Sequence, residues 1–147
     1  MPAANETLVH LIFGVTQTKQ GEDMGQQTKM IEHLPFETSQ MIGSRARIGI
    51  VVLATDYTIE HEMRTLVNLP GVDIYHARIP NSPNISPDIL RAMEPLITAT
   101  AELILPGDTL DVLAYACTSA SIVLGTPTVA KNLNAAKPEA KTTNPAF

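Results

Sequence analysis

The feature that most constrains this chain is a regular alternation of apolar, β-branched runs with helical patterns, which begins at Arg45. Residues 47–54 are almost continuously apolar, as expected for a strand that is covered on both faces. Residues 72–79 alternate between apolar and polar side chains, which is typical of a second strand. A third apolar run, Leu110–Ala116, leads directly into Cys117, the single cysteine of the sequence.

Helical patterns lie between and after these strands. Thr58 is a candidate N-cap, and Ser86-Pro87 combines a capping residue with proline at the first helical position. The predicted helices are residues 59–67, 87–105 and 119–136, the last split near Gly125-Thr126-Pro127, and a fourth strand is predicted to open at Lys141-Thr142-Thr143.

This order of elements predicts an α/β fold, a parallel sheet with right-handed crossovers and helices on both faces, in three layers like a flavodoxin-like lobe. In such sheets ligands bind beyond the carboxyl ends of the strands. Two of these ends carry polar residues: Thr55-Asp56-Tyr57-Thr58 after the first strand and Cys117-Thr118-Ser119 after the third. We therefore expect the functional site at this edge.

Composition excludes several classes of function. The 147 residues suit one domain, and the net charge of −5 without a Lys/Arg cluster argues against nucleic acid as a partner. A single cysteine fits a reducing cytoplasm, and the early apolar run Leu8–Val15 is too short to span a membrane. Residues 1–29 are predicted to be a poorly ordered extension, and residues 30–147 the α/β domain, located in the cytoplasm.

Cys117 is the strongest candidate for chemistry. A helix is predicted to begin just after it, and a helix N-terminus stabilises anions, including a thiolate and a bound carboxylate. Thr118 and Ser119 could bind such a carboxylate through backbone N–H and hydroxyl groups. A buried cysteine is also an ordinary small core residue, so both interpretations stay open. The four histidines show no metal-ligand spacing, and no metal is predicted.

Several segments also match a known family. Residues 47–62 resemble the opening strand and loop of the maleate isomerase and arylmalonate decarboxylase group, within the aspartate/glutamate racemase superfamily. Residues 75–79 resemble its second strand, and residues 116–121 (Ala-Cys-Thr-Ser-Ala-Ser) are similar to the cysteine motif of maleate isomerases. Lys137-Pro138 and residues 142–145 resemble the segment that leads into its central strand.

The resemblance implies a fold of two similar α/β lobes, with the active site between them and without metal or organic cofactor. It implies a cofactor-independent isomerase or racemase acting on a small mono- or dicarboxylic acid such as maleate, or on an amino-acid-like substrate, with Cys117 as nucleophile or base. Maleate isomerases usually carry asparagine where this chain has Asp56. The predicted site comprises Cys117 and Asp56 as catalytic residues, with Thr55, Tyr57, Thr118, Ser119, Thr143 and Asn144 binding the substrate.

The sequence ends where the second lobe of such an enzyme would begin, and it offers no second cysteine. We expect the partner of this lobe to be either a C-terminal lobe or a second copy of the chain. Decarboxylases of the group carry their single cysteine in the other lobe, so Cys117 argues against that activity. Two alternatives remain: a non-catalytic, truncated half-domain that binds a small carboxylate, and a flavodoxin-like module for a phosphate cofactor. The first loop lacks the cradle that the latter needs.

Overall fold

The computed structural model describes Glu37 and residues 41–146. All the elements below belong to the compact unit Thr38–Phe147. The predicted N-terminal extension, residues 1–29, lies outside the described residues. Within the described part of the chain, no helix is long and apolar enough to cross a membrane.

The sheet has four parallel strands in the order β2-β1-β3-β4. The elements are β1 (Ala46–Leu53), α2 (Ile59–Leu66), β2 (Val72–Ile79), α3 (Pro87–Arg91), α4 (Glu94–Glu102), β3 (Val112–Tyr115), α5 (Thr118–Leu124), α6 (Thr126–Ala136) and β4 (Lys141–Thr143). This strand order is that of flavodoxin-like sheets, and it confirms the predicted fold class.

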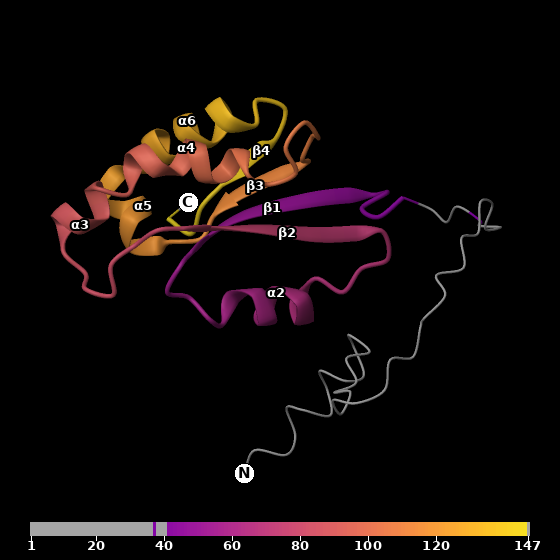
Figure 1. The fold of residues 1–147 in the computed structure, drawn as a ribbon, viewed down its shortest axis with the longest axis horizontal. Helices are drawn as coiled ribbons and strands as arrows, with labels where there is room; N and C mark the ends of the chain where they lie inside the picture. Colours follow the sequence, from indigo (N-terminus) through magenta and orange to yellow (C-terminus); the bar gives the residue numbers. More distant parts are fainter. Residues whose placement is uncertain (1–36, 38–40, 147) are drawn as a thin grey trace, which may run out of the picture. The chain divides into compact units, whose positions relative to one another are not determined.

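Helices cover the two faces of the sheet unequally. In Figure 1, α3, α4 and α6 lie over one face, and α2 lies against the other. The first face carries the main core, in which Val51, Ile79 and Leu113 are fully buried beneath the helices. None of the residues of α2 is buried. The main hydrophobic core of this unit therefore lies between the sheet and the layer formed by α3, α4 and α6, to which α5 adds Ala120.

The single helix expected over residues 87–105 is two helices, and Pro95 explains the break. In a continuous helix the ring of Pro95 would collide with the carbonyl group of Arg91, and its nitrogen has no hydrogen to donate. The chain instead ends α3 at Arg91 and begins α4 at Glu94, which places Pro95 in the first turn, where a missing N–H costs nothing. The predicted split at Gly125 is confirmed, with a positive φ of 83°.

Gly49 lets the helical layer approach the centre of the sheet. A Cβ atom at this position would lie 2.6 Å from Cδ1 of Leu110 and 3.3 Å from Cγ2 of Ile104. The glycine in the middle of β1 is therefore required by close packing of the segment that follows α4.

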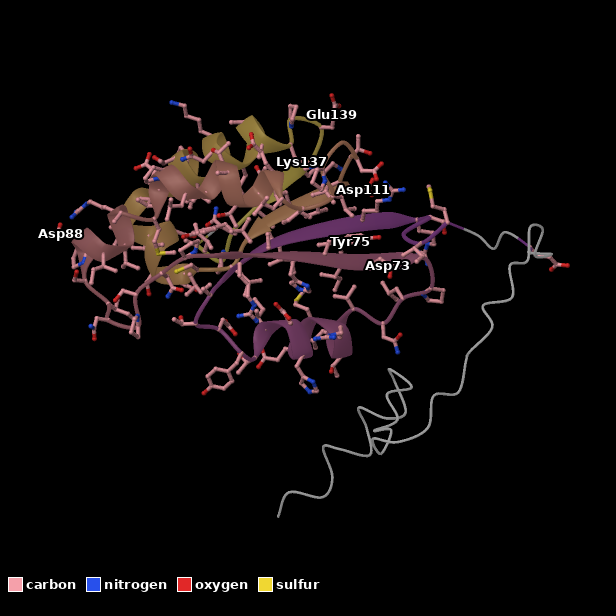
Figure 2. The ribbon with its side chains drawn as sticks, in the orientation of Figure 1. Asp73, Tyr75, Asp88, Asp111, Lys137 and Glu139 are labelled. Atoms are coloured by element: carbon pink, nitrogen blue, oxygen red, sulfur yellow. The ribbon has the colours of Figure 1, made fainter. Side chains whose placement is uncertain are left out.

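Charged residues fix the amino-terminal edge of the sheet. A carboxylate oxygen of Asp73 accepts a hydrogen bond from the backbone N–H of Gly43 at 2.7 Å, and Asp111 accepts one from Arg47 at 2.8 Å. Figure 2 shows Asp73 and Asp111 at this end of the sheet, and Asp88 at the opposite end on α3. Both carboxylates hold the backbone just before or at the start of β1.

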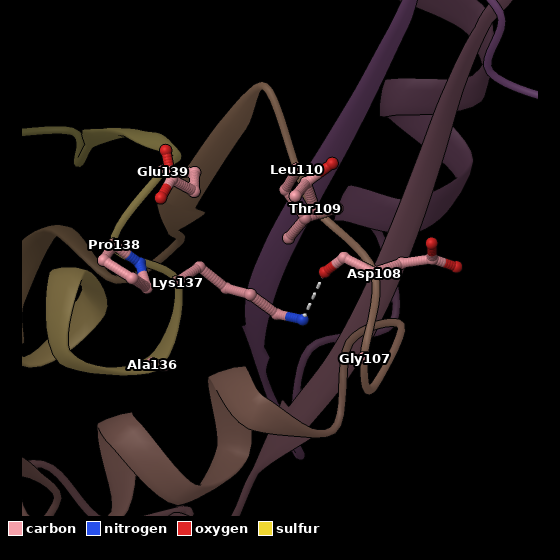
Figure 3. Close-up of a pocket in the computed structure, with 8 residues that line it drawn as sticks. All are labelled: Gly107, Asp108, Thr109, Leu110, Ala136, Lys137, Pro138 and Glu139. Atoms are coloured by element: carbon pink, nitrogen blue, oxygen red, sulfur yellow. Dashed lines mark hydrogen bonds between the residues drawn. The ribbon is translucent and has the colours of Figure 1, made fainter.

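Lys137 anchors the loop that enters β3. Its side chain is 8% exposed, and its ammonium group donates to the carbonyl oxygens of Leu105 at 2.8 Å and Asp108 at 2.9 Å. Figure 3 shows the bond to Asp108 across a pocket at this edge. Leu105 has a φ of 45°, a conformation that non-glycine residues rarely adopt, so the lysine holds a strained turn in place.

We expect Lys137→Met to lower the free energy of unfolding by about 1–3 kcal/mol, because two partly buried hydrogen bonds from a charged donor to the carbonyl groups of Leu105 and Asp108 are lost. Lys131→Met, on the exposed side of α6, is the matched control and should change stability by less than about 0.5 kcal/mol. Urea unfolding of both variants measures the difference. Equal losses from the two substitutions would show that the contacts of Lys137 contribute nothing to stability.

Candidate active site

A pocket of about 110 Å³ opens at the carboxyl edge of the sheet. Parallel pairing of β1 with β3 places Val51 beside Tyr115, so the segments that leave these two strands start next to each other. The pocket is lined by Leu53, Thr55, Asn81, Ser82, Pro83, Asn84, Ile85, Ile89, Leu90, Met93, Cys117 and Ser119. Its wall is largely apolar on the α3 side and polar in the loops that follow β1 and β2.

Cys117 occupies the junction of β3 and α5. Its backbone is extended, with φ −142° and ψ 102°, and it is the N-cap residue of α5, as the sequence predicts. The carbonyl oxygen of Cys117 accepts hydrogen bonds from the backbone N–H of Ser121 at 3.0 Å and from its hydroxyl at 2.8 Å. The residue is 7% exposed and lines the pocket. The thiol is therefore held on a fixed backbone at the pocket wall.

Thr55 and Asn81 join the loops after β1 and β2. The side-chain oxygen of Asn81 accepts the backbone N–H of Thr55 at 3.2 Å, and its amide nitrogen donates to the Thr55 hydroxyl oxygen at 2.8 Å. The same nitrogen donates to the carbonyl oxygen of Ser82 at 3.1 Å. These bonds close one side of the pocket around Thr55.

Asp56 performs the capping role at the start of α2. One carboxylate oxygen accepts the backbone N–H groups of Thr58 at 2.8 Å and Ile59 at 3.0 Å, and the Thr58 hydroxyl at 3.2 Å. Thr58 itself makes no side-chain capping bond. The bonds from Ile59 and then Thr58 lower the pKa of Asp56 below its ordinary value, so the group is an ionised carboxylate at neutral pH.

Arg78 clamps the loop after β1 from the α2 side of the sheet. Its guanidinium group forms an ion pair with Glu60 at 2.9 Å and donates to the carbonyl oxygens of Ala54 and Asp56. Because these partners use its donors, Arg78 stabilises the loop that carries Thr55 and does not line the pocket. Glu60, in the first turn of α2, therefore helps to hold Arg78 against this loop.

Tyr115 is the last residue of β3, two residues before Cys117, and it is fully buried. Burial raises the pKa of Tyr115 well above its ordinary value, and the neighbouring Cys117 adds to the effect. The phenol hydroxyl has no hydrogen-bond partner within the described residues. Tyr115 is therefore a neutral core residue beneath the thiol, and it does not act as a base.

The structure brings together three of the predicted site residues, Thr55, Cys117 and Ser119, around one pocket. The other five do not line it. Tyr57 is 90% exposed, Thr118 and Thr143 are exposed, and Asn144 is buried with its side-chain oxygen bound to the N–H of Ala146. The catalytic assignment of Asp56 and the binding role of the others stay predictions, and Asp56 has a competing structural role.

Sequence reasoning missed the loop after β2. Asn81, Ser82 and Asn84 line the pocket, together with Ile85, which is 76% exposed. The available signal was positional: in a parallel sheet the loop after β2 opens on the same edge as the loops after β1 and β3. Within the described residues, no group of three or more His, Cys, Asp or Glu side chains could hold a metal ion.

Comparison with known proteins gives one informative similarity. No protein-family model matches the chain, and no match was found among curated proteins. Among solved structures, the chain is similar to the maleate cis-trans isomerase of Nocardia farcinica bound to Tris, with 27% sequence identity and a TM-score of 0.51. The similarity supports a family-level relationship. It covers 67% of this chain and 44% of the isomerase, so the chain spans less than half the length of the protein it matches.

The capping geometry predicts how Asp56 variants behave. Asp56→Ala should lower the free energy of unfolding by roughly 0.5–2 kcal/mol, and Asp56→Asn should change it little because asparagine caps equally well. The lowered pKa means that the carboxylate stabilises the fold fully above its ordinary value of 3.8, and that this contribution disappears as the pH falls below it. Asp56→Asn should lack this acid-dependent loss, as urea unfolding between pH 3 and 7 would measure.

The same Asp56→Asn variant separates capping from catalysis. We expect any turnover to stay within a few fold of the wild type. A loss on the order of 10²–10⁴ with unchanged stability would instead identify Asp56 as an acid–base group. Asp88→Asn, which alters an exposed ion pair in the first turn of α3, controls for the general effect of removing one carboxylate.

Proposed function

We propose that this chain carries the first cysteine of a cofactor-independent isomerase that converts a small cis dicarboxylate such as maleate to its trans isomer. The support is the position of Cys117 in a pocket at the carboxyl edge of the sheet, and the similarity of the fold to a maleate cis-trans isomerase. The proposed roles are nucleophile for Cys117 and carboxylate binding for Thr55 and Ser119, which line the same pocket.

One observation favours isomerisation over racemisation. Cys117 is the only ionisable side chain among the described residues that line the pocket. Racemisation removes a proton on one face of a carbon and returns one on the other, which requires two opposed acid–base groups. Cis–trans isomerisation by addition and elimination requires a single nucleophile, so one thiol is enough.

The proposed reaction balances without an external reagent. The thiolate of Cys117 forms a C–S bond to one alkene carbon, and the π electron pair moves through the other alkene carbon into its carboxylate. The former double bond is then single and rotates. The electron pair returns, the double bond forms again in the trans geometry, and the C–S bond breaks to release the thiolate. No proton is gained or lost by the substrate carbons.

The side chains that line the pocket determine how it would bind the carboxylates of a substrate. No charged side chain lines it among the described residues, because Asp56 is bound to the start of α2 and Arg78 to Glu60. Substrate carboxylates would therefore be bound by neutral donors such as hydroxyl groups. An ionised carboxylate accepts such bonds strongly, since charge-assisted hydrogen bonds are about twice as strong as neutral ones.

A second candidate function is carboxylate binding without turnover. The observation that favours it is that, among the described residues that line the pocket, Cys117 is accompanied by no second thiol or acid–base group. In that case catalysis would need a group from a second lobe or from a second copy of the chain, both of which stay proposals. An assay of fumarate formation against protein concentration separates the cases, because activity from a second copy rises more steeply than linearly.

Cys117→Ser should reduce maleate isomerisation to a few per cent of the wild-type rate or less. The substitution keeps the size of the side chain but replaces a thiol with a hydroxyl, which is hardly ionised at neutral pH and is a poor nucleophile. Fumarate formation followed by proton NMR measures the rate, and circular dichroism checks the fold. Ser119→Ala, at a neighbouring exposed position of the pocket, is the control and should retain a measurable rate. A Cys117→Ser variant with wild-type turnover would refute the proposed role.

A further inference from the structure

The amide group of Asn81 has its orientation fixed by two backbone groups. The N–H of Thr55 can only donate, and it is bound to one side-chain atom of Asn81 at 3.2 Å. The carbonyl oxygen of Ser82 can only accept, and it is bound to the other at 3.1 Å. The atom facing Thr55 N–H must therefore be the oxygen, and the atom facing Ser82 must be the nitrogen.

This orientation determines the direction of a third hydrogen bond. The amide nitrogen of Asn81 also lies 2.8 Å from the hydroxyl oxygen of Thr55, and it can only donate. The Thr55 oxygen is consequently the acceptor, and its own proton is directed elsewhere. Within the described residues, the Thr55 hydroxyl donates to no protein acceptor.

We propose that Asn81 is a positioning residue that occupies one lone pair of the Thr55 hydroxyl and leaves its proton free to donate to a carboxylate of the substrate. The inference rests on the proposed function, and it specifies that the Thr55 hydroxyl donates a hydrogen bond to the ligand. Thr55, Asn81 and Cys117 line one pocket, so a carboxylate bound by Thr55 belongs to the same ligand that meets the thiol. An ionised carboxylate can only accept hydrogen bonds, so it is a suitable partner for a donating hydroxyl group.

Two pairs of variants test the proposal. Thr55→Val removes the hydroxyl at nearly constant size, and Thr55→Ser keeps it. Asn81→Asp replaces the donating nitrogen with an acceptor oxygen, which would take the proton of Thr55 away from the ligand. Asn84→Asp is the matched control, because it adds the same charge to the same pocket, while the side chain of Asn84 makes no hydrogen bond to Thr55.

The measurement is the dissociation constant of maleate, determined by titration calorimetry on the full chain in a Cys117→Ser background that prevents turnover. We expect Thr55→Val to weaken binding roughly 10- to 100-fold, the usual range for one hydrogen bond to a charged group, and Thr55→Ser to stay within about threefold. Asn81→Asp should weaken binding about tenfold more than Asn84→Asp. In a Thr55→Val background, this difference between the two aspartates should vanish.

Three results would overturn the proposal: no measurable maleate binding by the parent chain, unchanged binding by Thr55→Val, or equal effects of Asn81→Asp and Asn84→Asp. Thermal unfolding checks each variant. If Asn81→Asp does not fold, Asn81→Ala takes its place, with an expected severalfold loss relative to Asn84→Ala.

The outcomes also separate this inference from the proposed function. The predicted binding pattern in a chain whose wild type forms no fumarate would keep the inference and refute the isomerase. Fumarate formation by the wild type, together with equal effects of Asn81→Asp and Asn84→Asp on maleate binding, would keep the isomerase and refute the inference.

Discussion

The parallel alignment of all strands around β1 is the constraint on which the rest of this structure depends. Because β1 pairs with both β2 and β3, the loops after these three strands open on one edge. Thr55, Asn81 and Cys117 thus meet at one pocket although they are far apart in the sequence. At the opposite edge, Asp111 and Lys137 make charge-assisted hydrogen bonds to backbone groups, which hold the start of β1 and the loop before β3.

The charged side chains near the pocket are bound to other parts of the fold, which limits the groups that could bind an anionic ligand. The ionised groups nearest the pocket are committed to the fold: Asp56 caps α2, and Arg78 binds Glu60 and the carbonyl groups of the β1 loop. A thiolate and a dicarboxylate would both be anions in a small, largely apolar space, and their mutual repulsion must be offset by neutral donors on fixed loops. The Asn81–Thr55 contact fixes one such donor before any ligand arrives, so no binding energy is spent on orienting it.

Sequence patterns predicted the sheet well because burial of parallel strands requires apolar runs, and Leu110–Ala116 and residues 47–54 supply them. They also predicted Cys117 at the start of a helix. The break between α3 and α4 follows from Pro95, a signal that was present but outweighed by the apolar stripe around it. The role of Asn81 could not be predicted, because it depends on the hydrogen bonds between Asn81 and Thr55. These residues are brought together only by the pairing of β1 with β2.

The most direct test of the central claim is isomerisation of maleate in D₂O, followed by proton NMR of the product. Addition and elimination through Cys117, which is the only ionisable side chain among the described residues that line the pocket, moves no proton to or from the substrate carbons. The account predicts fumarate that retains both of its vinylic hydrogens. Fumarate that gains deuterium in step with turnover would contradict it and would require an acid–base group opposite the thiol. Failure to form fumarate would contradict the assignment of an isomerase to this chain.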